Sequence, residues 1–392
     1  MLQKIEICGK YTKANIMASS FQEEIIPDII KTCNLKVFEN EKIVVMPDCH
    51  PGKGCVVGFT STYKDALVPN MIGVDQGCGM CISDITDAFN KDNIEIVLES
   101  IDSFIRDKIP HGFNVNKSFN DIKPYVKNLG LIEEIINISS IIGDSDKYNY
   151  HIKSLGSLGG GNHFIEISND SNGRVYLIIH SGSRNFGLKT AKYFQKLAVE
   201  YCRSKSLSLN NKEKYSVHKE LCFLEDDILK DYEYVHNIAV QFAETNREII
   251  SKRIHNHLNI NTDCKHIIHN YIDTDNKIIR KGAISAKKDE LVLIPINMRD
   301  GSIIGYGKGN NEWNNSAPHG AGRITSRKKA KELISLDDFE KSMVGIYSTS
   351  INKNTIDESP MAYKSIDDIL ECVVDTIEIT DILKPIYNFK SS

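Results

Sequence analysis

The sequence lacks the features of export and of membrane insertion. Residues 1–6 contain no apolar core of a signal peptide. No uninterrupted apolar run approaches the roughly 20 residues that a membrane-spanning helix needs. The 392 residues are 41% hydrophobic and 26% charged, which is the composition of a globular protein with one large domain or two. We therefore expect a cytoplasmic protein that does not contact a membrane.

A disulfide framework is not expected either. The ten cysteines stand at irregular spacings in a large chain without a secretion signal, so most are expected to be small buried apolar residues. Cys78 and Cys81 form a C-x-x-C pair, which is typical of structural zinc or redox sites. No second pair of this kind follows, and this argues against a zinc ribbon.

A strong net charge is missing as well. With 48 basic and 52 acidic residues the formal charge is −4, which argues against a surface that binds nucleic acid indiscriminately. A local basic channel is still compatible with this total, because phosphate binding depends on where charges lie. Basic residues do cluster over 280–288 and 323–331, either as phosphate contacts or as solvated surface.

The apolar pattern predicts a mixture of strands and helices. Short β-branched runs predict buried strands at 42–46, 56–59, 175–179 and 291–294. Apolar residues three and four apart predict helices over 225–257, 189–204 and 365–383. The polar segment 113–150 is expected to form peripheral helices and loops. Because no strict βαβ rhythm is present, we predict an α+β fold rather than a doubly wound sheet.

Four strand-end or turn segments each offer side chains that bind metals. Asp75 and Cys78 lie three apart in a glycine-containing turn, His163 follows a triple-glycine loop, and His180 and His269 each end an apolar run. One such histidine alone is more often a hydrogen-bonded core residue, but the repetition favours ligands. If the thiolate bridges two ions, these five residues could serve a two-metal site that stabilises displacement at phosphorus. Ligand softness alone predicts zinc first, and manganese or iron second.

His319 stands in a different context. It precedes Gly320-Ala321-Gly322 and a basic run from Arg323 that we predict to be the first turns of a helix. A helix N-terminus offers free N–H groups to an anion, and Arg323 adds a bidentate donor. An imidazole beside such an anion site could attack phosphorus and hold it covalently. The alternative is a histidine that contacts phosphate without a covalent role.

Seven motifs occur together, in the order 46–50, 73–80, 161–166, 180–184, 280–283, 319–323 and 360–364. With these motifs the chain resembles the RtcB family of RNA ligases over nearly its whole length. The resemblance implies a single α+β domain of buried mixed sheets flanked by helices, with 113–150 as a peripheral, variable segment. It also implies that the protein joins an RNA 3′-phosphate or 2′,3′-cyclic phosphate end to a 5′-hydroxyl end, in RNA repair or tRNA splicing. RNA, GTP and manganese are then expected to bind, and an activating protein of the archease type is a further expected partner.

The resemblance also assigns roles to residues. His319 would take GMP from GTP as a phosphoramidate and pass it to the RNA 3′-phosphate, from which the 5′-hydroxyl displaces it. Manganese replaces zinc on these grounds. The residues matching the ligands of two manganese ions are Asp75, Cys78, His163, His180 and His269. Those matching nucleotide contacts, besides His319, are Asn162, Glu166, Asn297, Gly320, Gly322, Tyr363 and Lys390, and those matching RNA or phosphate contacts are Asp48, His50, Arg184, Lys281 and Arg323.

One segment departs from the family pattern. Most relatives carry Pro-Gly-Ser-Met-Gly where this chain has Pro-Ile-Asn-Met-Arg-Asp-Gly at 295–301. Because this segment helps to bind the nucleotide, a second hypothesis is a metal-dependent phosphoesterase that opens cyclic phosphates without ligation. A third is a non-catalytic protein that binds RNA ends. The complete ligand set together with His319 favours the ligase.

Overall fold

The computed structural model describes residues 4–90, 93–207 and 212–391. Its first sheet has six strands in the order β1-β2-β3-β4-β12-β11. Neighbours in this sheet are antiparallel except for the parallel pair β2 and β3. The strands are β1 (Lys4–Cys8), β2 (Lys13–Met17), β3 (Ile43–His50), β4 (Val57–Thr62), β11 (Asn270–Asp273) and β12 (Ile278–Lys281).

The second sheet has seven antiparallel strands in the order β10-β6-β8-β7-β17-β15-β14. They are β6 (Gly79–Asp84), β7 (Phe164–Asn169), β8 (Val175–Ser181), β10 (Lys265–Ile268), β14 (Leu291–Asn297), β15 (Gly301–Gly307) and β17 (Ile377–Lys390). Two small ladders pair β13 (Ala283–Ser285) with β16 (Ser316–Pro318) and β5 (Ala66–Leu67) with β9 (Leu224–Glu225).

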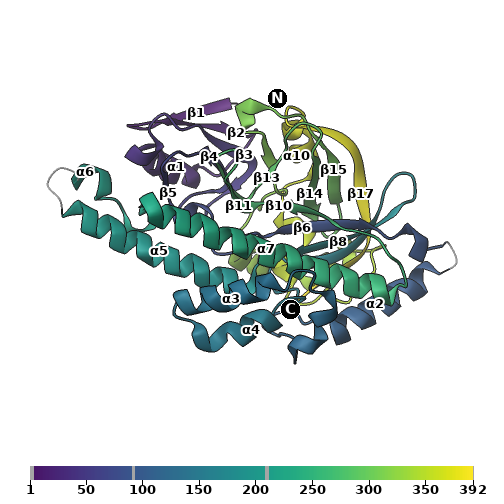
Figure 1. Cartoon of the computed structure of the whole chain (residues 1–392). Helices are drawn as coiled ribbons and strands as arrows, with labels where there is room; N and C mark the ends of the chain where they lie inside the picture. The colour runs from purple at the N-terminus through teal and green to yellow at the C-terminus, as the bar shows by residue number, and fades with distance from the viewer. Residues whose placement is uncertain (1–3, 91–92, 208–211, 392) are drawn as a thin grey trace.

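Two long helices, α5 and α7, run side by side across one face of the sheets (Figure 1). The apolar face of α7 packs Ile250 and Ile254 against Leu177 and Ile179 of β8 in one buried cluster. Among the described helices, none is long and apolar enough to cross a membrane. The helices are α1 (Ile26–Cys33), α2 (Ile94–Lys108), α3 (Gly130–Ile141), α4 (Tyr148–Lys153), α5 (Arg184–Ser206), α6 (Lys212–Tyr215), α7 (Asp226–His257), α8 (Arg327–Leu333), α9 (Leu336–Ser342) and α10 (Ile366–Val373).

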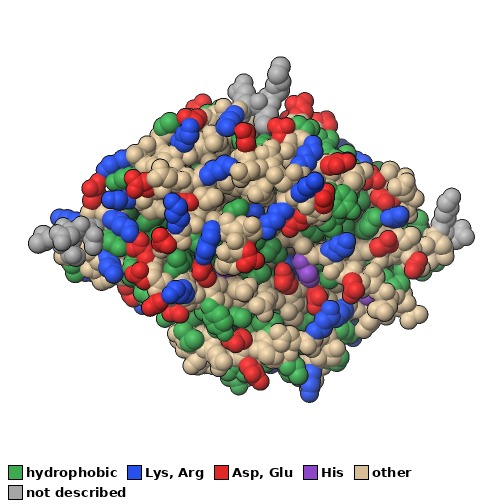
Figure 2. All heavy atoms as spheres, turned by 45° about the horizontal axis from the view of Figure 1, so that its top comes forward, with side chains coloured by type: hydrophobic (Ala, Val, Ile, Leu, Met, Phe, Trp, Pro, Cys, Tyr) green, Lys and Arg blue, Asp and Glu red, His purple; other side chains and the backbone are tan. Residues whose placement is uncertain are grey.

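The predicted α+β class is confirmed. The four predicted strands correspond to β3, β4, β8 and β14, and the predicted helices over 225–257 and 189–204 correspond to α7 and to most of α5. The segment 113–150 forms α3, short 3₁₀ turns, connecting loops and the start of α4. Basic and acidic side chains are interspersed over the face that Figure 2 presents, as expected for a small net charge.

The predicted helix over 365–383 is wrong in its second half. Helix α10 ends at Val373, and β17 begins at Ile377 and pairs with β15. A box formed by Ser365 and Asp368 caps the start of the helix. After Val373 the chain forms a strand, because pairing with β15 buries Ile377 and Leu383 in the core of the sheet. A short apolar pattern does not distinguish a helix from a buried strand.

Gly77, in the turn before β6, lets the sheet approach α7 closely. Its φ is +69°, and a Cβ there would lie 2.7 Å from the Cα of Val240. We expect Gly77→Ala to lower the free energy of unfolding by about 3 kcal/mol, from steric overlap and the left-handed backbone together. Gly173→Ala is the control, because Gly173 has φ +83° but no atom lies within 4 Å of the point that its Cβ would occupy. Urea unfolding should show a clearly smaller loss for the control, and equal losses would refute the role of the close approach.

Candidate functional site

One edge of the seven-stranded sheet collects four of the predicted metal ligands. The adjacent strands β10, β6, β8 and β7 are antiparallel, so the end of one lies beside the start of the next. Residues that are far apart in the sequence therefore meet at this edge. They are His269 after β10, Cys78 before β6, His180 near the end of β8, and His163 before β7.

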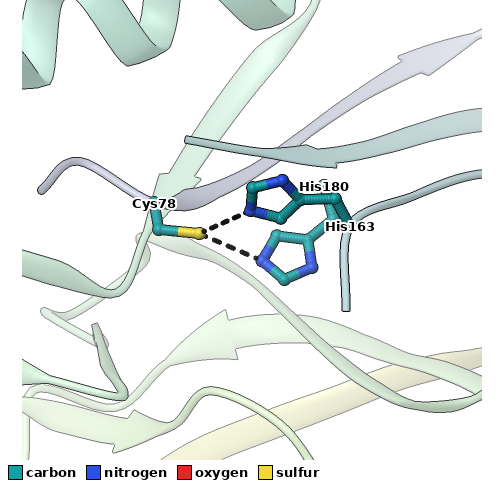
Figure 3. Close-up of side chains that lie close together, drawn as sticks. All are labelled: Cys78, His163 and His180. Atoms are coloured by element: carbon teal, nitrogen blue, oxygen red, sulfur yellow. Dashed lines mark hydrogen bonds between the residues drawn. The ribbon is translucent and has the colours of Figure 1, made fainter. Parts of the chain in front are cut away.

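The Cys78 sulfur is the centre of this group. It lies 3.5 Å from Nε2 of His163 and 3.3 Å from Nε2 of His180, and both rings point towards it (Figure 3). Nδ1 of His163 donates to the carbonyl of Leu158 at 3.0 Å, and Nδ1 of His180 donates to the carbonyl of Asn162 at 3.1 Å. Because these bonds place each ring proton on Nδ1, both Nε2 atoms present a lone pair to the sulfur.

Asp75 completes a cluster of electron-pair donors. Its Oδ2 lies 3.1 Å from Nε2 of His163. Burial holds the pKa values of His180 and His269 well below their usual range, so both rings are neutral. Burial also raises the pKa of the Cys78 thiol. The cluster thus brings together two imidazole lone pairs, a carboxylate and the Cys78 sulfur, which loses its proton when it binds a metal. This set of electron-pair donors fits a cation.

His319 lies next to this cluster. The rings of His180 and His269 are 5.1 Å apart between centroids, and those of His269 and His319 are 4.9 Å apart. The carboxylate of Asp48, which is fully buried, accepts a hydrogen bond of 3.1 Å from the backbone N–H of His319. The same Oδ2 lies 2.6 Å from Nδ1 of His319, although this contact does not have hydrogen-bond angles. Asp48 thus holds both the backbone and the ring of His319.

The helix predicted to begin at Arg323 is confirmed only from Arg327 onwards. Helix α8 begins at Arg327, capped by Ser326, while Arg323 forms a β-bridge with Tyr363. The basic run therefore does not place a helix N-terminus beside His319. Arg323 forms the bridge because its backbone then pairs with Tyr363, and its guanidinium donates to the Tyr363 hydroxyl and the Asp357 carbonyl.

A cavity of about 210 Å³ opens beside His319 and His269. It brings together all the residues that were predicted to contact a nucleotide, and also His50 and Arg323. Eight further lining residues were not among the predicted contacts: Phe164, Pro295, Ile296, Met298, Ala321, Arg327, Glu358 and Asn388. Of these, Glu358 and Asn388 lie outside every motif that the sequence analysis identified.

Glu358 organises the cationic side of the cavity. Its buried carboxylate accepts hydrogen bonds from Nζ of Lys390 at 2.9 Å, from the hydroxyl of Tyr363 at 2.8 Å and from Nη1 of Arg327 at 2.5 Å. Nη1 of Arg323 lies 3.4 Å from the same carboxylate. Burial acts to raise the pKa of Glu358, but Lys390 and Arg327 outweigh it and the pKa is lowered. The buried Glu358 carboxylate thus positions Lys390, Tyr363 and Arg323, which are three of the predicted contacts.

Several predicted contacts are already bonded within the protein. The ammonium of Lys281 donates to the carbonyls of Lys53, Cys55 and Asn70, at 2.6, 3.1 and 3.2 Å. The amide of Asn297 bonds Asp300 within its own turn.

Two more predicted phosphate contacts also have protein partners. Arg184 donates to the carbonyl of Gly112 at 2.6 Å and to the hydroxyl of Ser157 at 3.1 Å. His50 donates from Nδ1 to the carbonyl of Asp48 at 3.0 Å. The roles of these side chains in binding phosphate therefore remain predictions.

A second group that could hold a metal lies elsewhere, formed by Glu248, Cys264 and His266. Nε of Arg247 donates to Nδ1 of His266 at 3.4 Å, so the ring proton sits on Nε2 and faces the sulfur of Cys264. Lys127 also pairs with Glu248. In this second group, N–H groups of His266 and Lys127 thus face the atoms that would have to bind a cation, so the group is a poorer metal site than the cluster at Cys78.

Comparison with known proteins gives one consistent result. The sequence model of the family described as tRNA-splicing ligase RtcB matches residues 29–391. The chain is 31% identical to the RNA-splicing ligase RtcB of Escherichia coli K12, over 88% of each protein. It is 25% identical to the tRNA-splicing ligase RtcB of Pyrobaculum aerophilum, over 84% of this chain and 83% of that protein. A second E. coli protein, RNA-splicing ligase RtcB2 of strain ATCC 25922, is 27% identical over 90% and 88%.

The cavity also contains a carboxyl group whose titration can be measured. Burial raises the pKa of Glu166 to about 7, although Ser168 and Asn388 donate hydrogen bonds to it. The native state therefore holds the proton more tightly than the unfolded chain does, so this stabilisation is lost as the pH rises from about 4.5 through 7.

In Glu166→Gln this titration is absent. Between pH 5 and 8, the unfolding free energy of the wild type should fall by roughly 2–3 kcal/mol relative to that of the variant. Urea titrations of both proteins at several pH values provide the measurement. Parallel pH profiles would contradict the assignment.

Proposed function

The chain belongs to the RtcB family, and from this premise we propose that it is an RNA ligase. Its substrates are an RNA 3′-phosphate or 2′,3′-cyclic phosphate end and a 5′-hydroxyl end, and it uses GTP and manganese in tRNA splicing or RNA repair. The position of His319 carries the proposal. Its ring lies between the cluster of metal-ligand atoms and the cavity, within ring contact of His269.

We assign two manganese ions to the five predicted ligands, Asp75, Cys78, His163, His180 and His269. The convergence of lone pairs at Cys78 and the unpartnered Nδ1 of His269 support this assignment. When bound, the ions would neutralise phosphate charge and stabilise in-line displacement at phosphorus.

His319 is the proposed nucleophile. A ring nitrogen attacks the α-phosphorus of GTP, so that an N–P bond forms and pyrophosphate leaves. An oxygen of the RNA 3′-phosphate then takes the GMP group from His319, and the 5′-hydroxyl displaces GMP to close the phosphodiester. A cyclic phosphate end is first opened by hydrolysis. Asp48 orients the ring and stabilises the positive charge that develops on it.

The cavity is the proposed nucleotide site. Its base and phosphate contacts would come from Asn162, Glu166, Asn297, Gly320, Gly322, Tyr363 and Lys390, and RNA contacts from His50 and Arg323, which also line it. An activating protein of the archease type is part of the proposal. So is a cytoplasmic location, which the ten free thiols support.

Labelling with GTP tests the covalent role. Protein mixed with manganese and GTP labelled at the α-phosphate should form an adduct that is labile to acid and stable to alkali. The adduct should disappear in His319→Ala, because the accepting nitrogen is gone, and should persist in His218→Ala, which changes an exposed histidine remote from the cavity. Failure of the wild type to form any adduct would disprove the covalent mechanism.

Joining of RNA ends separates the ligase from a cyclic phosphodiesterase. With GTP and manganese, a cyclic-phosphate end and a 5′-hydroxyl end should yield one joined strand on a denaturing gel. The family is one of ligases, which favours joining. Opening of the cyclic end without joining would support the phosphodiesterase instead.

Manganese binding has a readout that does not depend on activity. A ligand at 100 times its Kd stabilises the native state by about 2.7 kcal/mol, so Mn²⁺ should raise the melting temperature of the wild type by several degrees, and chelation should reverse this. Cys78→Ala should lose most of the shift. Cys264→Ala should keep it, because that thiol belongs to the second group. An equal loss in both variants would contradict the assignment.

A further inference from the structure

Most buried polar atoms around the cavity are already hydrogen-bonded within the protein. Among the described residues that line it, three buried side-chain atoms have no hydrogen-bond partner: Nδ1 of His269, Nδ1 of His319 and Oδ1 of Asn388. Of these, Nδ1 of His319 still contacts the Asp48 carboxylate at 2.6 Å. The first two belong to rings in the proposed catalytic centre. The amide oxygen of Asn388 has no role in the proposed chemistry.

Asn388 is held in a defined orientation. It lies in β17 directly opposite Glu166 in β7, and it is 1% exposed. Its Nδ2 donates a hydrogen bond of 2.8 Å to Oε2 of Glu166. Above the pKa of Glu166, which burial raises to about 7, a carboxylate accepts this bond. The nitrogen end of the amide then faces Glu166 and the oxygen end is left free. A buried acceptor without a partner destabilises the native state, and an N–H group of a ligand would relieve this cost.

This wall of the cavity offers acceptors. Ser168 donates to Oε1 of Glu166 at 2.9 Å, so both carboxylate oxygens are fixed, and each keeps a lone pair for a ligand. Together with Oδ1 of Asn388 they match a base that carries several N–H groups on one edge. Guanine has N1–H and a 2-amino group on one edge. Hypoxanthine lacks the amino group, and adenine presents an acceptor nitrogen in place of N1–H.

We propose that the amide oxygen of Asn388 accepts a hydrogen bond from the 2-amino group of guanine and so makes the cavity select GTP over ITP. This inference rests on the proposed function, since it takes the cavity to be the GTP site. Asn388 is then a specificity-determining residue that also positions Glu166. The nearby 295–301 segment does not offer a comparable group, because the side-chain amide of Asn297 is bonded within its own turn.

The test is equilibrium binding measured by calorimetry at pH 8, without metal and with EDTA, so that no chemistry occurs. The wild type should bind GTP at least about tenfold more tightly than ITP, since hypoxanthine leaves Oδ1 unpaired. This comparison needs no variant and does not depend on the folding of a mutant. Equal affinities for GTP and ITP would overturn the inference and leave the proposed function intact.

Two variants separate direct contact from positioning. Asn388→Leu keeps the side-chain volume and should reduce the ratio of the two affinities at least about fivefold. Ser168→Ala removes the other donor to Glu166 without touching Oδ1, so it should weaken both nucleotides alike and keep the ratio within about twofold. A ratio that is unchanged in a folded Asn388→Leu protein, or that collapses in Ser168→Ala, would refute the contact. If the wild type binds neither nucleotide, the proposed function and this inference both fail.

Discussion

The buried guanidinium of Arg247 joins the parts of the molecule on which the site depends. From the middle of α7 it donates two hydrogen bonds of 2.8 Å, to the carbonyls of Gly77 and Ser181. Gly77 precedes Cys78, and Ser181 follows His180, so one side chain clamps two ligand-bearing strand ends. Since a guanidinium removed from water needs such acceptors, moving either strand end away from α7 would be costly. The neighbouring Asn246 adds a bond to the carbonyl of Gly182.

The site divides into two regions of opposite character. The cluster around Cys78 gathers lone pairs, whereas the far side of the cavity gathers lysine and arginine around Glu358. Divalent ions suit the first region, and the anionic groups of a nucleotide suit the second. His319 lies at the boundary, where a ring oriented by Asp48 can meet a phosphate that both regions attract.

Local patterns were reliable where one interaction dominates. The 3.6-residue periodicity of α7 and the β-branched runs of β8 and β14 predicted these elements because burial of one face decides their structure. The same reasoning failed after Val373 and after His319. There a long-range partner, β15 in one case and Tyr363 in the other, outweighed the local preference for helix.

By itself, the sequence determined the family, because short motifs in a fixed order carry it. The same motifs predicted the metal ligands and the role of His319, since their chemistry does not depend on distant contacts. Only the tertiary structure decided which side chains remain free to act. Lys281 is occupied by three carbonyls, and Glu358 binds cations from other segments. Asn388 meets Glu166 only because β17 pairs with β7. Such pairings depend on strand register and burial, which no local pattern specifies.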